Sequence, residues 1–384
     1  MRDSAGPRVG LILSGGGARA AYQVGVLKAI AQMLPKGASN PFPIICGTSA
    51  GAINAAVLAI YATRFQEGVK RLGLVWKNFR VHQVFRADAI GVLKSSLHWF
   101  IAMSLGGIGK YNPMSLLDRT PLRRFLERYV PCEEIQQSID AGAIRAVSIT
   151  ASGYTSGKSV SFYQGVPFLI PWDRARRVGK ASEITIDHLM ASSAIPFVFP
   201  AVRVGRDYFS DGSVGQMAPI SPALHLGADR VLVIGVRPPM SRDVPSEDPE
   251  SYPSLAEVAG HILNSIFLES LEADLERLQR INKTLSAIPS HELKDGGVKL
   301  RHVDVLVISP SEDLEETAQR FAHHLPRPVR FLLRGVGARK QSGTSLVSYL
   351  LFEKPYCRRL IALGYADTMQ RKDEVMKFLN YESG

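Results

Sequence analysis

Ser49 lies between Gly47 and Gly51 in the pattern Gly-x-Ser-x-Gly, after an apolar run at 42–46 and before an alanine-rich stretch that continues to about residue 62. We expect Ser49 to be a nucleophile on a sharp strand-to-helix turn, because glycines two positions away on either side let the backbone double back without a collision. The start of a helix also places free N–H groups where negative charge would develop. The alternative is a glycine-rich turn that only joins two packed elements.

A second glycine-rich turn, with Gly15, Gly16, Gly17 and Arg19, follows an apolar run at 9–13. In a parallel sheet, this turn and the serine turn lie at the same carboxyl edge. Backbone N–H groups of the glycines could then form an oxyanion hole, in which each donor contributes about 3–4 kcal/mol to the stabilisation of a tetrahedral intermediate. Arg19 would either steer a phosphate or fix the loop.

This second turn also fits the pattern Gly-x-Gly-x-x-Ala of a dinucleotide-binding site. Such a site needs an Asp or Glu about 20 residues beyond the last glycine to bind the ribose. No acidic residue occurs between Ala20 and Gln66, and the second predicted strand ends in the serine turn instead. We therefore predict no nucleotide cofactor, and no other cofactor.

A serine nucleophile needs a base, and the histidines do not supply an obvious one. His188 and His225 are the least implausible of the nine, yet none of the nine has the context of a triad. Asp211 stands in the sequence Asp-Gly-Ser after a predicted strand at 207–209, and it could accept the proton of Ser49 directly if its surroundings raise its pKa. The alternative is an ordinary Asp-Gly turn.

Strands and helices alternate along the first part of the chain. The runs at 9–13 and 42–46, joined by a helix over 18–34, form a β-α-β unit and predict parallel strands. Further strands are predicted at 144–151, 158–163, 202–204, 207–209, 231–236 and 303–309, and further helices at 64–80, 120–129, 254–281 and over much of 311–384. Thr120 is expected to be the N-cap of its helix, with Pro121 at the first helical position.

Two apolar stretches raise the question of a membrane. Residues 38–63 carry no charge, but prolines, glycines and an asparagine interrupt them, which is typical of the centre of an α/β sheet and not of a membrane span. Residues 89–109 are rich in bulky side chains and fit a mobile cap, a membrane-facing helix or a buried connecting helix. The polar N-terminus lacks the apolar core of a secretory signal, so we predict a cytoplasmic protein, with peripheral contact at the inner membrane face as an option.

The chain of 384 residues has a formal net charge of +11. Its Lys and Arg residues are dispersed, which disfavours nucleic acid as a partner and leaves either an anionic membrane surface or a solvated basic surface. Three widely separated cysteines, and the lack of residue clusters at metal-ligand spacing, predict neither disulfides nor a metal site. The sequence does not indicate an oligomeric state.

Taken in order, the segments 15–19, 47–51 and 211–212 resemble the three motifs of the patatin-like phospholipases. The segment 191–200 is similar to the turn that precedes the aspartate in that family. This resemblance covers about residues 8–225, and later helices are similar to the C-terminal extension of bacterial members.

The resemblance implies a three-layer α/β/α fold with a mostly parallel central sheet. Residues 1–236 would form the catalytic core, and 237–384 a largely helical C-terminal extension packed on it as part of one structural unit.

The resemblance also implies a catalytic dyad of Ser49 and Asp211, without a histidine, and an oxyanion loop at Gly15, Gly16, Gly17 and Arg19. The chain departs from the family pattern at Ala20 and Ser213, where glycine is usual; both residues are small, so we expect the dyad to be intact.

The expected function is that of a serine lipid acyl hydrolase, of the phospholipase A, lysophospholipase or carboxylesterase type, which acts on a phospholipid or another acyl-ester lipid through an acyl-enzyme. The alternatives are an acyltransferase that uses the same acyl-enzyme and a membrane-associated lipid-binding regulator with little catalysis.

Overall fold

The computed structural model describes residues 7–86, 117–237, 270–288, 300–335 and 344–381. Two predictions fall on other residues. The apolar stretch 89–109 and the first part of the helix expected from residue 254 lie outside the described residues.

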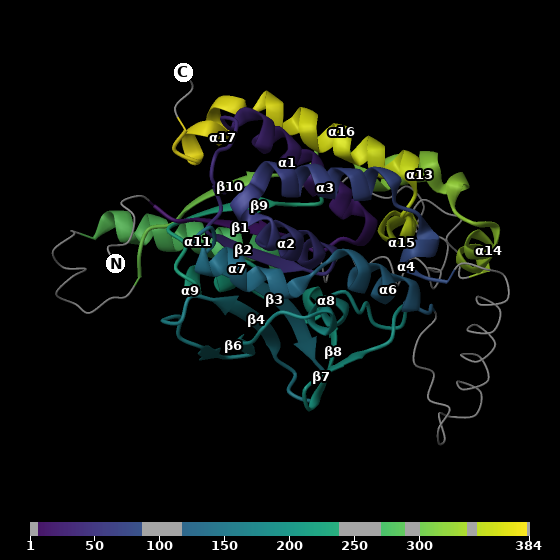
Figure 1. The fold of residues 1–384 in the computed structure, drawn as a ribbon, viewed down its shortest axis with the longest axis horizontal. Helices are drawn as coiled ribbons and strands as arrows, with labels where there is room; N and C mark the ends of the chain where they lie inside the picture. Colours follow the sequence, from purple (N-terminus) through teal and green to yellow (C-terminus); the bar gives the residue numbers. More distant parts are fainter. Residues whose placement is uncertain (1–6, 87–116, 238–269, 289–299, 336–343, 382–384) are drawn as a thin grey trace, which may run out of the picture.

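A central sheet runs through the molecule in the strand order β10-β9-β1-β2-β3-β4-β6-β5, with β8 paired to β3 and β7 to β8 (Figure 1). The strands are β1 (Val9–Leu13), β2 (Ile44–Thr48), β3 (Ala146–Gly153), β4 (Ser159–Gly165), β5 (Trp172–Arg174), β6 (Arg177–Ala181), β7 (Val202–Val204), β8 (Asp207–Asp211), β9 (Arg230–Ile234) and β10 (Asp304–Ile308). The five from β10 to β3 are parallel, whereas β3 and β4 form the expected antiparallel hairpin. The mostly parallel sheet is confirmed.

Helices cover both faces of this sheet, which gives three layers (Figure 1). They are α1 (Ala21–Met33), α2 (Ala50–Ile60), α3 (Phe65–Asn78), α4 (Val81–Val84), α6 (Thr120–Tyr129), α7 (Ile135–Asp140), α8 (Ile186–Ser192), α9 (Ser221–His225), α11 (Ser270–Ala287), α13 (Leu314–Phe321), α14 (Arg327–Gly335), α15 (Thr344–Leu350), α16 (Lys354–Gln370) and α17 (Lys372–Phe378).

The alternation of side chains along β1 shows how the layers form. Leu11 and Leu13 belong to one hydrophobic core, with residues of α1, α2, α3 and α16. Ile12, between them, belongs to a second core on the opposite face, with residues of α9 and α11. Since the central strands are buried on both faces, they read as continuous apolar runs in the sequence.

The uncharged run 38–63 forms β2 and α2 inside this core, as expected. Among the residues that the structure describes, no helix has the length and apolar character that a membrane crossing requires.

The C-terminal helices pack on the N-terminal part of the chain. α16 lies along α1, and the two helices share the first hydrophobic core (Figure 1). The hydroxyl of Tyr22 in α1 donates a hydrogen bond of 2.9 Å to Asp367 in α16. The division of the chain at residue 236 stays a prediction.

Several element boundaries differ from those predicted. The second strand occupies 44–48 and not 42–46, because Asn40 bonds both backbone groups of Phe42 in a bend and Pro43 has no N–H for strand pairing. The antiparallel pair of β5 and β6 was not predicted, and neither was the helix α8. The helix α11 ends at residue 287 instead of 281.

The start of α6 also differs. Thr120 is already helical and Arg119 is the N-cap residue, so the prediction that Thr120 is the N-cap is wrong. The reason is Asp118, whose carboxylate accepts hydrogen bonds from the N–H and the hydroxyl of Thr120. The N–H of Thr120, at the start of the helix, is thereby satisfied.

Candidate active site

Ser49 occupies the turn between β2 and α2, at φ 56° and ψ −127°. A Cβ atom at Gly47 would lie 2.5 Å from the carbonyl oxygen of Gly51, and one at Gly51 would lie 2.2 Å from that of Leu13. Both positions therefore require glycine because the backbones approach so closely. The strained backbone of Ser49 is typical of residues that a surrounding structure holds for function.

Hydrogen bonds from α8 and β3 fix this turn. The N–H of Ser49 donates to Ser192 Oγ at 2.9 Å, and Ser192 Oγ donates to the carbonyl of Thr150 at 2.6 Å. Ser49 is buried, with 2% of its surface exposed. Ser192 was not predicted as a site residue, although it lies in the segment 191–200 that resembles the turn ahead of the aspartate.

Asp211 ends β8 and is completely buried. Its N–H donates to the carbonyl of Ala194 at 2.8 Å, and its Oδ1 accepts a hydrogen bond of 3.0 Å from the N–H of Ser213. Within the described part of the chain, Oδ2 has no hydrogen-bond partner. A buried carboxylate oxygen without a partner is costly, and such atoms mark functional sites.

Burial raises the pKa of Asp211 from 3.8 to about 6, while the Ser49 hydroxyl, Ser213 and the charge of Arg119 oppose this rise. The serine hydroxyl is thus a neighbour of the carboxyl, although the contact is not aligned as a hydrogen bond to Oδ2. Catalytic contacts in unliganded sites are often loose in this way. A carboxylate with a pKa near 6 is ionised at neutral pH and is a stronger base than an ordinary aspartate.

The glycine turn at Gly15, Gly16 and Gly17 lies at the same edge of the sheet, after β1. No hydrogen bond between described residues uses the N–H groups of these three glycines. Gly17 has φ +55°, and a Cβ there would lie 2.3 Å from the carbonyl oxygen of Tyr349 in α15. The N–H groups of this loop are therefore available to a ligand, and the backbone of α15 packs against the loop at Gly17.

The side chain of Arg19 reaches into that C-terminal part. Its Nε donates to Ser348 Oγ at 2.8 Å, one terminal nitrogen lies 3.0 Å from the carboxylate of Glu315, and its guanidinium lies 4.2 Å from the ring centre of Tyr349. Burial disfavours its charge, but electrostatic interactions with Tyr349 and with the carboxylate of Glu315 outweigh burial and raise the pKa of Arg19. Of the two roles expected for Arg19, these contacts support that of fixing the loop.

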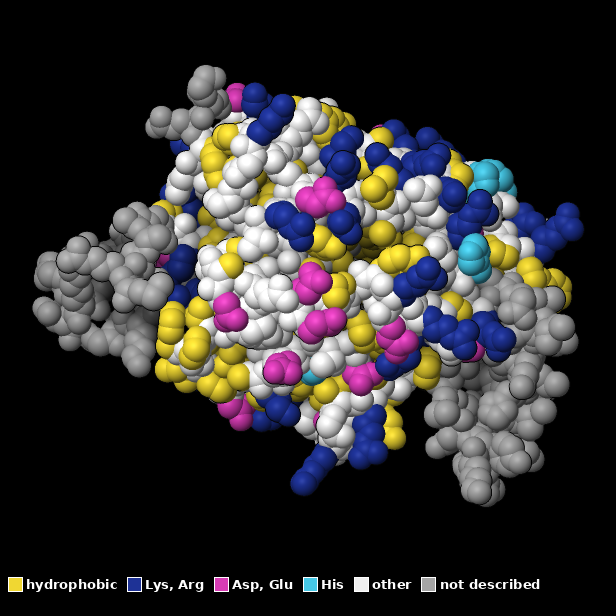
Figure 2. Space-filling model, viewed as in Figure 1, with side chains coloured by type: hydrophobic (Ala, Val, Ile, Leu, Met, Phe, Trp, Pro, Cys, Tyr) yellow, Lys and Arg dark blue, Asp and Glu magenta, His cyan; other side chains and the backbone are white. Residues whose placement is uncertain are grey.

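A cavity of about 270 Å³ begins at Ser49. Its walls are mostly apolar and come from α2, α3, α6, α15 and the segment after α8; they include Ile53, Val57, Leu72, Val75, Trp76, Phe79, Leu122, Phe125, Leu126, Phe199, Leu350 and Phe352. Figure 2 shows hydrophobic side chains in a hollow between the positions of α3 and α6 in Figure 1. Leu72 and Trp76 of α3 belong to the first hydrophobic core and also line this cavity.

The two histidines weighed as bases lie elsewhere. His188 caps the start of α8 through Thr185, and His225 stacks on Trp172 in the second core. Burial lowers the pKa of both imidazoles to about 4. In the described residues, no group of three His, Cys, Asp or Glu residues is arranged to hold a metal ion.

Two solved structures are similar to this chain over most of its length. VipD from Legionella pneumophila has 13% sequence identity and a TM-score of 0.35, with 97% of this chain and 69% of VipD covered. The complex of ExoU with SpcU from Pseudomonas aeruginosa has 14% identity and a TM-score of 0.27, with 96% and 78% covered.

The sequence is also 42% identical, over 82 residues, to lysophospholipase nte1 of Aspergillus terreus. This match covers 20% of the chain and 5% of the fungal protein, so the chain spans a small part of that relative. Residues 11–224, which contain both glycine turns, Ser49 and Asp211, match the family model of the patatin-like phospholipases. The chain belongs to the patatin-like phospholipase family.

Proposed function

We propose that this protein is a serine hydrolase of lipid acyl esters, of the phospholipase A, lysophospholipase or carboxylesterase type, with Ser49 as nucleophile and Asp211 as base. The observation that carries this proposal is the apolar cavity that begins at Ser49. A fatty acyl chain that fills it brings its ester carbonyl to the serine.

The reaction has two steps that balance in protons. Ser49 Oγ attacks the ester carbonyl and its proton passes to Asp211 Oδ2, the buried oxygen without a partner. The ester C–O bond then breaks, and the leaving alcohol takes the proton from Asp211. Water attacks the acyl-enzyme in the same manner, with Asp211 as base, and the fatty acid leaves while Ser49 regains its proton.

Charge on the tetrahedral intermediate is stabilised by the unused N–H groups of Gly15, Gly16 and Gly17, and by the N-terminus of α2. The C-terminal helices support this loop through Gly17 and Arg19. These supporting contacts need to be rigid, because a donor displaced by about 1 Å costs about a hundredfold in rate.

The acyl chain lies along α2. Ile53 and Val57 line the cavity four and eight residues after Ser49, which at 1.5 Å per residue places them about 6 and 12 Å along the helix axis. Each methylene group of the chain that is buried there contributes about 0.8 kcal/mol to binding.

The test uses nitrophenyl esters of increasing chain length, lysophospholipid and phospholipid, with a fluorophosphonate probe for the serine. We expect wild-type protein to hydrolyse esters and to be labelled, and Ser49→Ala to do neither. Val57→Phe should lose activity on long-chain esters while short-chain esters, the internal control, are cleaved at the wild-type rate. No hydrolysis of any ester by folded wild-type protein would contradict the proposal.

The same experiment addresses the two alternatives. An acyltransferase would transfer the acyl group to an added alcohol or thiol acceptor in preference to water, and product analysis detects this. A lipid-binding regulator would bind vesicles without being labelled. Basic side chains gather over α13, α14 and α16 on the face shown in Figure 2, which supports the prediction of peripheral contact with an anionic membrane.

A further inference from the structure

The turn at residues 192–194, where α8 ends, connects the two candidate catalytic residues. Ser192 Oγ accepts the hydrogen bond of the Ser49 N–H, and the carbonyl of Ala194 accepts that of the Asp211 N–H. The backbones of nucleophile and base are therefore both anchored on residues 192–194. A shift of this turn would move one relative to the other.

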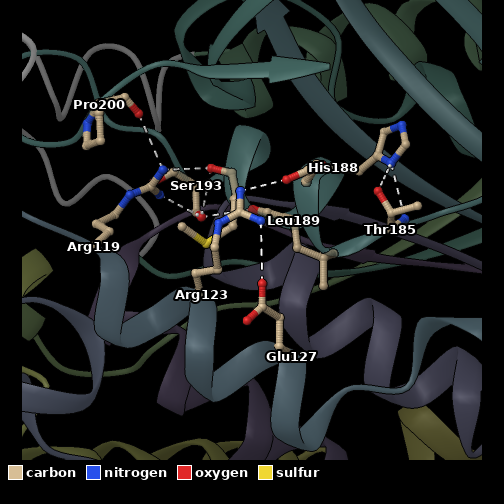
Figure 3. Close-up of polar contacts among 10 residues, drawn as sticks. Arg119, Arg123, Glu127, Thr185, His188, Leu189, Ser193 and Pro200 are labelled. Atoms are coloured by element: carbon tan, nitrogen blue, oxygen red, sulfur yellow. Dashed lines mark hydrogen bonds and ion pairs between the residues drawn. The ribbon is translucent and has the colours of Figure 1, made fainter. Parts of the chain in front are cut away.

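Arg119, the residue before α6, holds this same turn (Figure 3). One terminal nitrogen donates to the carbonyl of Ser193 at 2.7 Å and to Ser193 Oγ at 3.1 Å. The other donates to the carbonyls of Met190 at 2.9 Å and Pro200 at 3.4 Å. The planar guanidinium thus ties the end of α8 to the segment that follows it, a geometry that lysine cannot reproduce.

Among the residues that the structure describes, no carboxylate is in ion-pair contact with Arg119. Arg119 is 1% exposed, its Nε makes no hydrogen bond, and none of the ion pairs between described residues includes it. Burial lowers its pKa to about 10, while the charge of Asp211 opposes this effect. Burial of an unpaired charge costs stability, so a structure that keeps one needs a reason for it.

Resting on the proposed function, we propose that Arg119 is a positioning residue for ester hydrolysis, which fixes Ser49 and Asp211 relative to each other through the turn at residues 192–194 and supplies the positive charge that faces the base. Arg119 does not line the cavity, so it acts through Ser193 and its neighbours and not on the substrate.

Within the described ranges, the charged or titratable groups that act on Asp211 are Arg119, ahead of α6, and Tyr349, in α15. The hydroxyls of Ser49 and Ser213 also interact with its carboxyl group. Tyr349 is neutral at the pH of the assay, because burial raises its pKa. Arg119 is therefore the cation that favours the ionised form of Asp211.

The experiment measures kcat and KM against pH on a short-chain nitrophenyl ester for wild type, Arg119→Met and Arg119→Lys. In Arg119→Met we expect the acid limb of kcat/KM, near pH 6 in wild type, to move to higher pH, because an opposite charge near a carboxylate is removed. We expect kcat to fall about 10- to 100-fold with KM little changed. Arg119→Lys should keep the wild-type midpoint and still lose kcat.

Arg123→Met is the matched control. Arg123 lies in the first turn of α6 and also bonds α8, but through Asp187 at its start, 2.6 Å away, and it is partly exposed. This variant should keep both the pH midpoint and kcat. Urea unfolding of each variant shows whether lost activity reflects lost folded protein.

The outcomes separate the two proposals. Wild-type protein that cleaves no ester would overturn the proposed function and this inference together. Wild-type activity with an Arg119→Met variant that keeps the wild-type midpoint would overturn the inference alone. So would an Arg119→Met or Arg119→Lys variant whose kcat falls only in proportion to its folded fraction.

Discussion

Arg19 and Arg119 are the two largest fully buried side chains of the described structure, and they are held in opposite ways. Arg19 has a carboxylate partner, Glu315, and its pKa is raised. Arg119 is held by carbonyl groups, and its pKa is lowered to about 10. The charge of Arg19 is stabilised by its surroundings, whereas burial of the charge of Arg119 costs folding free energy.

The two arginines contact residues that line the same cavity. Arg19 stacks on Tyr349 and Arg119 bonds Ser193, and both of these residues line the cavity that begins at Ser49. Burial alone therefore does not assign a role to an arginine. A paired guanidinium joins two parts of the chain, while one whose charge interacts with the candidate base is coupled to the chemistry.

The largest effect should come from Asp211→Asn, which removes the charge that faces Arg119. We expect kcat to fall by about a thousandfold or more, since the base is lost. The stability of the variant should rise, because the pKa of Asp211 is raised from 3.8 to about 6 and its ionised form is therefore disfavoured in the folded state. In wild type, the protonated form of Asp211 is favoured by folding. The stability that this preference contributes is fully present below pH 4 and is lost as the pH rises through 6.

At pH 8 the loss amounts to about 3 kcal/mol, so Asp211→Asn should be more stable than wild type by about 2–3 kcal/mol in urea unfolding, and equally stable at pH 4. A variant that is inactive and destabilised at pH 8 would show that the charge of Asp211 opposite Arg119 stabilises the fold. That result would contradict the proposed difference between Arg119 and Arg19.

Gly17→Ala should have the next largest effect, on the Arg19 side. The new methyl group would lie 2.3 Å from the carbonyl oxygen of Tyr349, at a residue with φ +55°. We expect the free energy of unfolding to fall by about 2–4 kcal/mol and kcat to fall with it, because either the glycine turn or α15 must move.

Gly142→Ala is its control, since Gly142 has φ +71° but no heavy atom within 4 Å of the added Cβ. It should lose about 1 kcal/mol of stability from the backbone conformation and keep its activity. Equal losses in the two variants would mean that contact with Tyr349 does not matter.

The sequence predicted the parts of this site that depend on local spacing. Ser49 and its flanking glycines have that spacing because two backbones cross at the turn, and the glycine turn after β1 follows the same logic. Asp211 was predicted from a turn pattern and from family resemblance. The three layers followed from continuous apolar strands that alternate with helices.

Contacts between distant segments could not be predicted in this way. Ser192 bonds Ser49 across 143 residues, and Arg119 bonds Ser193 across 74. One signal for Arg119 was present: it precedes the buried residues Leu122 and Leu126 by three and seven positions, so it lies on the apolar face of α6. The boundary of β2 was missed because it depends on the side chain of Asn40.

The smallest effect should come from Glu315→Gln, which removes the charge partner of Arg19. Glu315 is partly exposed, with 27% of its side chain accessible, and Arg19 keeps its contacts with Ser348 and Tyr349. We expect stability to fall by about 1 kcal/mol in urea unfolding, with kcat within about threefold of wild type. Glu316→Gln in the same helix, which breaks an exposed pair with Arg320, should change stability by less than about 0.5 kcal/mol.

Removal of a negative charge should therefore change stability in opposite directions beside the two arginines. Loss of the carboxylate beside Arg19 destabilises the protein because that pair is an ordinary structural contact. Loss of the carboxylate facing Arg119 stabilises the protein, because the cost of burying the Asp211 charge exceeds what its interactions with neighbouring groups offset. If both variants changed stability with the same sign at pH 8, the two arginines would be equivalent structural clamps, and the assignment of Arg119 to the chemistry would depend on its pH profile alone.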